Sequence, residues 1–201
     1  MKILTKTFSF LLHPLLMPTI GILILMYSNS YIAFIPESAK KMIIILTAVG
    51  TFLLPALMIP IFMLRGMVTE IQMDDRRERL FPLAITLIFY ILTFVLFIRI
   101  PVYRLIHAFM LGTLLSLLAG FLITFKWKIS THMIGLGGLT AFILIVSLHL
   151  NIYMLPHLIL VILASGIAGA SRLYLNAHNA TQVCVGFITG FVVMAGSLVG
   201  Y

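Results

Sequence analysis

Charged residues and cysteine are both scarce in this sequence. Only 9% of its 201 residues are charged, five residues are acidic, and hydrophobic residues make up 62% of the chain. The mean hydropathy of +1.21 excludes a soluble domain. The apolar runs are unbroken rather than alternating, which excludes an outer-membrane barrel, and the single cysteine, Cys184, excludes an internal disulfide. We therefore predict an all-α fold, a polytopic membrane helix bundle with six to seven transmembrane helices.

Seven apolar stretches are each close to the roughly 20 residues that a membrane-spanning helix needs. In the first of them His13-Pro14 and Pro18 interrupt the start, which predicts either a kinked span or a segment lying at the membrane interface, with His13 as an interface residue. The chain is then one integral membrane domain, with residues 1–40 as an additional N-terminal span or interfacial segment and 42–201 as a six-helix core. The seven stretches lie near residues 10–35, 42–64, 82–100, 104–125, 131–150, 156–175 and 180–200.

One polar stretch, between the last two spans, contains an arginine and a histidine six residues apart. Polar groups placed between apolar segments at a membrane are costly and suggest a functional site. On one unbroken helix, Arg172 and His178 would point roughly 240° apart. They can meet only if one helix ends near Leu175 and another starts near His178, a break that Asn176 and Asn179 favour. A guanidinium beside an imidazole suits a phosphate ligand.

A second polar stretch precedes the fifth span and consists of Lys126, Lys128, Ser130, Thr131 and His132 with their neighbours. Ser130 or Thr131 is a suitable helix N-cap, and helix N-termini attract anions, so His132 is placed where a bound phosphate would lie. The small residues of 135–141 and 164–170 predict close packing of the last three spans. Such packing would bring the two polar stretches together.

The loop near residues 65–80 contains six consecutive charged residues, from Asp74 to Arg79. Such a run usually forms a solvated surface. The alternative is that one or two of its arginines reach over the site as phosphate ligands. With seven spans, this loop and the loops near 126–130 and 171–179 all open on the same side of the membrane.

The distribution of Lys and Arg predicts which side that is. The formal net charge of +8 does not indicate nucleic-acid binding, because the cations of so apolar a chain lie in loops and meet lipid headgroups. The positive-inside rule places the side with nine cations in the cytoplasm of a bacterial-type inner (plasma) membrane. That side carries Lys2, Lys6, Arg65, Arg76, Arg77, Arg79, Lys126, Lys128 and Arg172, and the other carries the four residues Lys40, Lys41, Arg99 and Arg104.

The remaining histidines do not indicate a metal site or a cofactor. His149 and His157 fall at the opposite ends of their spans from His132 and His178, so we expect them outside the site. No two histidines stand at i, i+3 or i, i+4, which is the spacing that a helix uses to bind a metal. We predict neither a metal nor a cofactor.

The two polar stretches resemble signatures of the type 2 phosphatidic acid phosphatase (PAP2) superfamily. Ser171-Arg172, five residues and then His178 are similar to its third signature, Ser-Arg-x5-His-x3-Asp, and Ile129-Ser130-Thr131-His132 resemble its second, Pro-Ser-Gly-His. The resemblance covers about the last 100 residues. It implies a PAP2-like core and a phosphatase for a lipid phosphate or a polyprenyl (di)phosphate. It further implies that His178 is the nucleophile of a phosphohistidine intermediate, that His132 protonates the leaving group, and that Arg172, Ser130 and Ser171 hold the phosphate.

The sequence departs from the family at several positions. Gln182 stands where the family has an aspartate, Ile129 and Thr131 replace its Pro and Gly, and the first signature is missing. The stand-ins that we consider for the missing groups are Lys126 and Lys128, or Arg76 and Arg79, for the first signature, and Asp74 or Asp75 for the orienting carboxylate. Two alternatives stay open: a catalytically weakened relative that binds or translocates lipid phosphates, and a small transporter or assembly factor.

Overall fold

The computed structural model describes residues 11–66 and 76–200, and it is built from helices. Among the described residues, six helices are long and apolar enough to cross a membrane, which confirms the predicted all-α polytopic bundle. The helical elements are η1 (Pro14–Leu16), α2 (Met17–Met26), η2 (Tyr31–Phe34), α3 (Glu37–Ala48), η3 (Val49–Leu53), α4 (Leu54–Leu64), α5 (Arg76–Arg99), α6 (Arg104–Thr124), α7 (Thr131–His149), α8 (Leu155–Tyr174) and α9 (Ala180–Val199). The first spanning helix is the continuous run of α3, η3 and α4, Glu37–Leu64.

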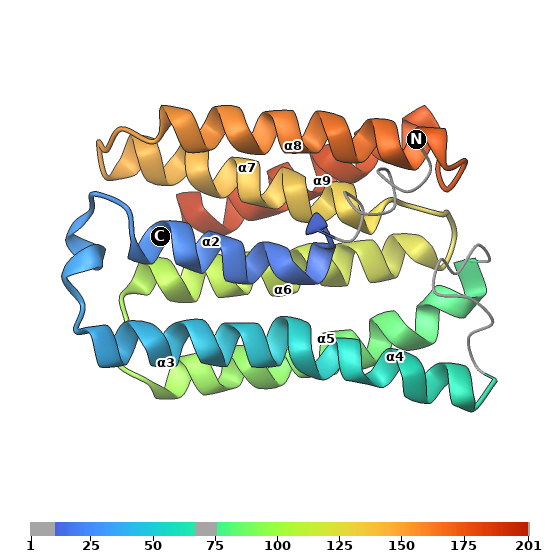
Figure 1. Cartoon of the computed structure of the whole chain (residues 1–201), viewed down its shortest axis with the longest axis horizontal. Coiled ribbons are helices and arrows are strands. Elements are labelled where there is room, and N and C mark those ends of the chain that lie inside the picture. Colours follow the sequence, from blue (N-terminus) through green and yellow to red (C-terminus); the bar gives the residue numbers. More distant parts are fainter. Residues whose placement is uncertain (1–10, 67–75, 201) are drawn as a thin grey trace.

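The first apolar stretch differs from the expected span. Its longest described helical part is Pro14–Met26, about 20 Å at 1.5 Å per residue, whereas the hydrocarbon core of a bilayer is about 30 Å thick. Pro14 and Pro18 fix the helix start, and the Ser28 hydroxyl bonds the Leu25 carbonyl just before the chain turns. In Figure 1, α2 lies between the other helices and covers only part of the length of the bundle. Leu25 and Met26 are fully buried, so this short helix packs inside the bundle.

The closest helix packing joins α7 and α9, as the small residues of the fifth span predict. A Cβ atom on Gly137 would overlap the backbone of Phe187, and one on Gly190 would overlap the backbone of Ile134. Glycine therefore allows these two backbones to touch. Not all small residues of α8 contact a neighbouring helix, because Gly166 faces open space. This packing fixes the start of α7 against the start of α9.

The polar loops lie at one end of the bundle, called the site end from here on. The end of α4, the start of α5 and the connections α6–α7 and α8–α9 are at that end, on the right in Figure 1, and the connections α2–α3, α5–α6 and α7–α8 are at the other. For the described residues, this arrangement agrees with the predicted common side of the three loops. His149 and His157 flank the α7–α8 connection and are exposed there, away from the site end, as expected.

Candidate functional site

The turn between α8 and α9 brings His178 back toward Arg172. Helix α8 ends at Tyr174, and Asn176 then adopts a positive φ of 53°, the left-handed conformation that commonly ends helices. The backbone N–H groups of Ala177 and His178 both donate to the carbonyl of Arg172, at 3.1 and 3.4 Å. The predicted helix break is therefore present, and it explains the spacing of six residues between Arg172 and His178.

Hydrogen bonds at the start of α9 fix the tautomer of His178. Asn179 and Gln182 form a capping box, in which the Gln182 Oε1 accepts the backbone N–H of Asn179 at 3.3 Å. A backbone N–H can only donate, so the atom that faces it is the amide oxygen. The same Oε1 lies 3.0 Å from Nδ1 of His178. Nδ1 therefore carries the proton, and Nε2 keeps its lone pair.

His178 is neutral and its lone pair faces a cation. The side chain is 8% exposed, and Nη1 of Arg79 lies 3.4 Å from Nε2. Burial lowers the pKa of His178 from 6.5 to about 4; Arg79, Lys128 and Arg172 act in the same direction, and the bond to Gln182 opposes them. At pH 7 the imidazole is thus a neutral base whose Nε2 lone pair accepts a hydrogen bond from Arg79, and a neutral nitrogen is what a nucleophile requires.

The start of α7 supplies a second imidazole. Helix α7 begins at Thr131, with Ser130 in the N-cap position but without a side-chain capping bond. The backbone N–H of Ser130 donates to the Gln182 carbonyl at 3.4 Å, which ties the start of α7 to that of α9. His132 follows within the first turn of α7.

His13 supplies a third imidazole, from the start of the short helix. Its ring meets the ring of His132 edge to face, with centroids 5.4 Å apart and planes at 75°. Its Nδ1 accepts the backbone N–H of Leu15 at 3.4 Å. Burial, followed by the nearby charge of Arg172, lowers the pKa of His13 from 6.5 to about 4. His13 thus belongs to the polar cluster, a position that the sequence did not predict.

These side chains gather around a cavity of about 370 Å³. The histidine and arginine residues that line it are His13, Arg79, His132, Arg172 and His178. None of the described lining residues is acidic, and most of the wall is apolar. Residues at the start of the short helix line the cavity, so it lies beside that helix start. Apolar lining residues include Pro55, Met58, Ile59, Phe62, Leu83 and Leu117.

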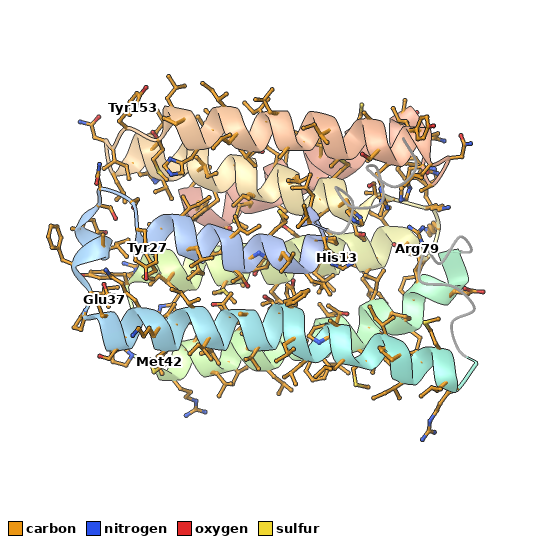
Figure 2. The ribbon with its side chains drawn as sticks, viewed as in Figure 1. His13, Tyr27, Glu37, Met42, Arg79 and Tyr153 are labelled. Carbon is orange, nitrogen blue, oxygen red and sulfur yellow. The ribbon has the colours of Figure 1, made fainter. Side chains whose placement is uncertain are left out.

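Figure 2 shows how the cavity residues are spread along the bundle. His13 stands at the inner start of α2, and Arg79 lies further toward the site end, on the first turn of α5. The Nε atom of Arg172 is buried and has no hydrogen-bond partner among the described residues. A buried guanidinium nitrogen without an acceptor favours binding of an anion, because an unpaired buried donor destabilises the empty site.

The cavity contains some of the predicted site residues and not others. His132, Arg172, His178 and Arg79 line it. Lys128 is close enough to His178 to lower its pKa, but it does not line the cavity. The other predicted ligands stand as follows: Lys126 is exposed, Ser130 and Ser171 are buried without lining the cavity, only the backbone of Arg76 is described, and Asp74 and Asp75 lie outside the described residues.

Several polar residues that line the cavity were not predicted as site residues, among them His13 and Thr131. The signal for His13 was available: a polar residue directly before a proline marks a helix start, and a helix that starts inside an apolar segment buries the polar residue at its first turn. No cluster of three or more His, Cys, Asp or Glu side chains that could hold a metal is present in the part of the chain that the structure describes. The chain matches no family model, no curated protein and no solved structure, so the chemistry of the cavity itself is the guide to function.

Proposed function

We propose that this chain is a membrane-embedded phosphatase of PAP2 type that acts on a lipid phosphate or diphosphate through His178. One observation carries the proposal: a neutral imidazole whose Nε2 lone pair faces Arg79 lies beside two arginines in a cavity whose remaining wall is mostly apolar. The cationic groups suit a phosphate, and the apolar wall suits a hydrocarbon chain. An amphiphile with a phosphate head group matches both parts.

The reaction proceeds in two steps. Nε2 of His178 attacks phosphorus, an N–P bond forms, and the P–O bond to the lipid breaks while protonated His132 gives its proton to the leaving oxygen. Water then attacks phosphorus, His132 takes a proton from that water, and the N–P bond breaks to release phosphate. Arg172 and Arg79 stabilise the charge on the equatorial oxygens. Arg79 moves from Nε2 to a phosphate oxygen when substrate binds.

The geometry supports the PAP2 resemblance at the two signatures. His132 and the Arg172–His178 pair come from helices far apart in sequence and line one cavity. Gln182 takes part of the role of the missing aspartate, because its Oε1 orients His178 as a carboxylate would. It supplies no negative charge, however.

That missing charge favours a second candidate function. A carboxylate at position 182 would stabilise the positive charge that develops on His178 during phosphoryl transfer. Without that charge, the site still offers two arginines and several imidazole donors to a phosphate. The second candidate is therefore a PAP2-like protein that binds or translocates lipid phosphates without turnover.

We place the site on the cytoplasmic side of a bacterial-type plasma membrane. Among the residues that the structure describes, seven Lys and Arg residues lie at the site end and four at the opposite end, and the positive-inside rule favours that orientation. A cysteine at the exposed Lys126, in a Cys184→Ser background, tests this placement. It should resist a membrane-impermeant maleimide in intact cells and react after lysis, and labelling in intact cells would reverse the orientation.

Phosphate release separates the functional candidates. Purified protein in detergent, without added metal, is incubated with a panel of lipid phosphates and diphosphates. The panel is repeated with His178→Ala, Arg172→Ala and the control His149→Ala, whose exposed side chain lies at the opposite end. Release that both site variants abolish and the control retains supports the phosphatase. Lipid phosphate binding without release favours the second candidate, and neither binding nor release leaves a small transporter or assembly factor.

A further inference from the structure

His13 stands at the start of the short helix, where that helix meets the cationic cluster. It lines the cavity together with Arg172 and His132, although it lies more than 100 residues before them in sequence. Its ring is in edge-to-face contact with His132 of α7, and its environment also contains the charge of Arg172 from α8. Arg79 and Tyr90 of α5 and His178 complete the titratable and charged groups that line the same space.

The hydrogen bonds of His13 determine which group it offers to a ligand. Nδ1 accepts the Leu15 N–H, so in the neutral ring the proton is on Nε2, on the far side of the ring from that helix start. The first backbone donors of this helix are already used: Leu16 N–H bonds the His13 carbonyl, Met17 N–H bonds the Pro14 carbonyl, and Pro14 has no N–H. An anion at this end of α2 is therefore bound by the imidazole and not by the backbone.

A neutral donor also fits the charge of the cavity. Arg79 and Arg172 already bring two positive charges into a space with no described acidic lining residue. A third permanent cation would be repelled while the cavity is empty. A neutral imidazole avoids that repulsion, and it can still donate a hydrogen bond to a phosphate oxygen.

We infer that His13 is a phosphate-binding residue, and that the short N-terminal helix places its Nε2–H on an oxygen of the phosphate that His178 attacks. The inference rests on the proposed function, because it concerns the same phosphate. It assigns to the start of the short helix a part of the site that neither polar stretch of the sequence contains. The phosphate can belong to a lipid head group or be free inorganic phosphate.

Two substitutions at one position separate ligand binding from helix capping. In His13→Asn the side-chain oxygen replaces Nδ1 as the cap of the helix start, and the distal donor is lost. In His13→Gln the longer side chain reaches the position of Nε2 with an amide N–H donor, and the cap is weakened. A phosphate ligand predicts that Gln restores binding and Asn does not, whereas a simple helix cap predicts the reverse.

Calorimetric titration of the full chain in detergent measures the effect with two probes, inorganic phosphate and 1-oleoyl lysophosphatidate. For a lost hydrogen bond to a charged group, we expect binding about 10- to 100-fold weaker in His13→Asn and within about threefold of the original in His13→Gln. Weakening with both probes means that His13 contacts the phosphate. The same weakening with the lipid alone identifies the lipid head group as the ligand that reaches it. Unchanged binding in His13→Asn overturns the inference and leaves the proposed function intact.

A measurement on the original chain covers the case in which both variants fail to fold. Diethyl pyrocarbonate modifies neutral imidazoles, and mass spectrometry locates the modified residue. Saturating phosphate should protect His13 and His178 and leave the exposed His149 reactive. Protection of His178 without His13 contradicts the inference. If the unmodified chain binds neither probe and no histidine is protected, the proposed function itself fails, and the inference about His13 fails with it.

Discussion

Replacing Gln182 with glutamate tests how His178 is held for attack. The Gln182 Oε1 accepts both hydrogen bonds that this side chain makes, from Nδ1 of His178 at 3.0 Å and from the backbone of Asn179 at 3.3 Å. A carboxylate oxygen accepts the same two donors, so the substitution keeps the geometry. The change adds a negative charge beside the imidazole and little else.

The size of the effect follows from Coulomb's law. Two unit charges about 4 Å apart attract each other by about 4 kcal/mol at an effective dielectric constant of about 20. Partial burial of the new carboxylate opposes this attraction, and we expect about 2 kcal/mol to remain. The pKa of His178, about 4 in the original chain, should therefore rise by about 1.5. His178 then stays mostly neutral at pH 7, and the charge that develops on it during phosphoryl transfer is better stabilised, so release should be about tenfold faster.

The assay combines a histidine titration by NMR with phosphate release at pH 7. His178→Asn identifies the resonance of His178, and Gln182→Leu serves as the control that removes both hydrogen bonds without adding charge. A pKa of His178 that stays near 4 or falls in Gln182→Glu would refute the reasoning about this contact. A raised pKa with no gain in release would show that charge at position 182 does not limit turnover.

Three further predictions concern the pH dependence of stability, the glycine packing between helices and the role of Arg79 as a ligand. His13 and His178 have a pKa of about 4 in the folded chain, against an ordinary value of 6.5, so the unfolded chain binds more protons between these two pH values. The free energy of unfolding should therefore be constant above pH 6.5 and fall by up to about 3 kcal/mol per histidine as the pH drops toward 4. Thermal unfolding in detergent measures this loss, which His178→Asn should reduce. Gly190→Ala should destabilise the bundle by about 1–3 kcal/mol and impair phosphate binding, because the added Cβ would overlap the Ile134 backbone. The control is Gly166→Ala, at a position that faces open space, and it should leave the melting temperature within about 1 °C of the original. Arg79→Gln should raise the pKa of His178, because it removes a neighbouring positive charge, and it should weaken phosphate binding at least tenfold. An unchanged affinity for phosphate would exclude Arg79 as a ligand.

Long apolar runs and helix-breaking residues made most of the fold predictable from the sequence. Six spans begin and end within a few residues of the expected positions, because unbroken apolar stretches of about 20 residues have few alternatives. The turn between Arg172 and His178 was predictable for a local reason, since Asn176 and Asn179 favour a left-handed residue and a helix cap. The common side of the polar loops followed from counting spans.

The short helix and its histidine were not predictable in the same way. Composition alone does not distinguish a kinked span from a helix half as long that packs inside the bundle, because both are apolar and both start at Pro14 and Pro18. Its position depends on packing against residues far away in sequence, such as His132. The role of Gln182 was not predictable for a related reason. Its identity indicates only that the negative charge of the family's aspartate is missing, whereas its hydrogen bond to His178 depends on the fold at the start of α9.

Trapping the covalent intermediate tests the central claim most directly. The purified chain is mixed with a ³²P-labelled lipid phosphate, quenched in alkali within milliseconds to seconds, and digested for mass spectrometry. The account predicts an acid-labile, alkali-stable phosphoryl group on the peptide that contains His178, absent in His178→Asn and present in the control His149→Asn. Phosphate release without any label on His178, or a folded chain that binds lipid phosphate and forms no phosphohistidine, would contradict it.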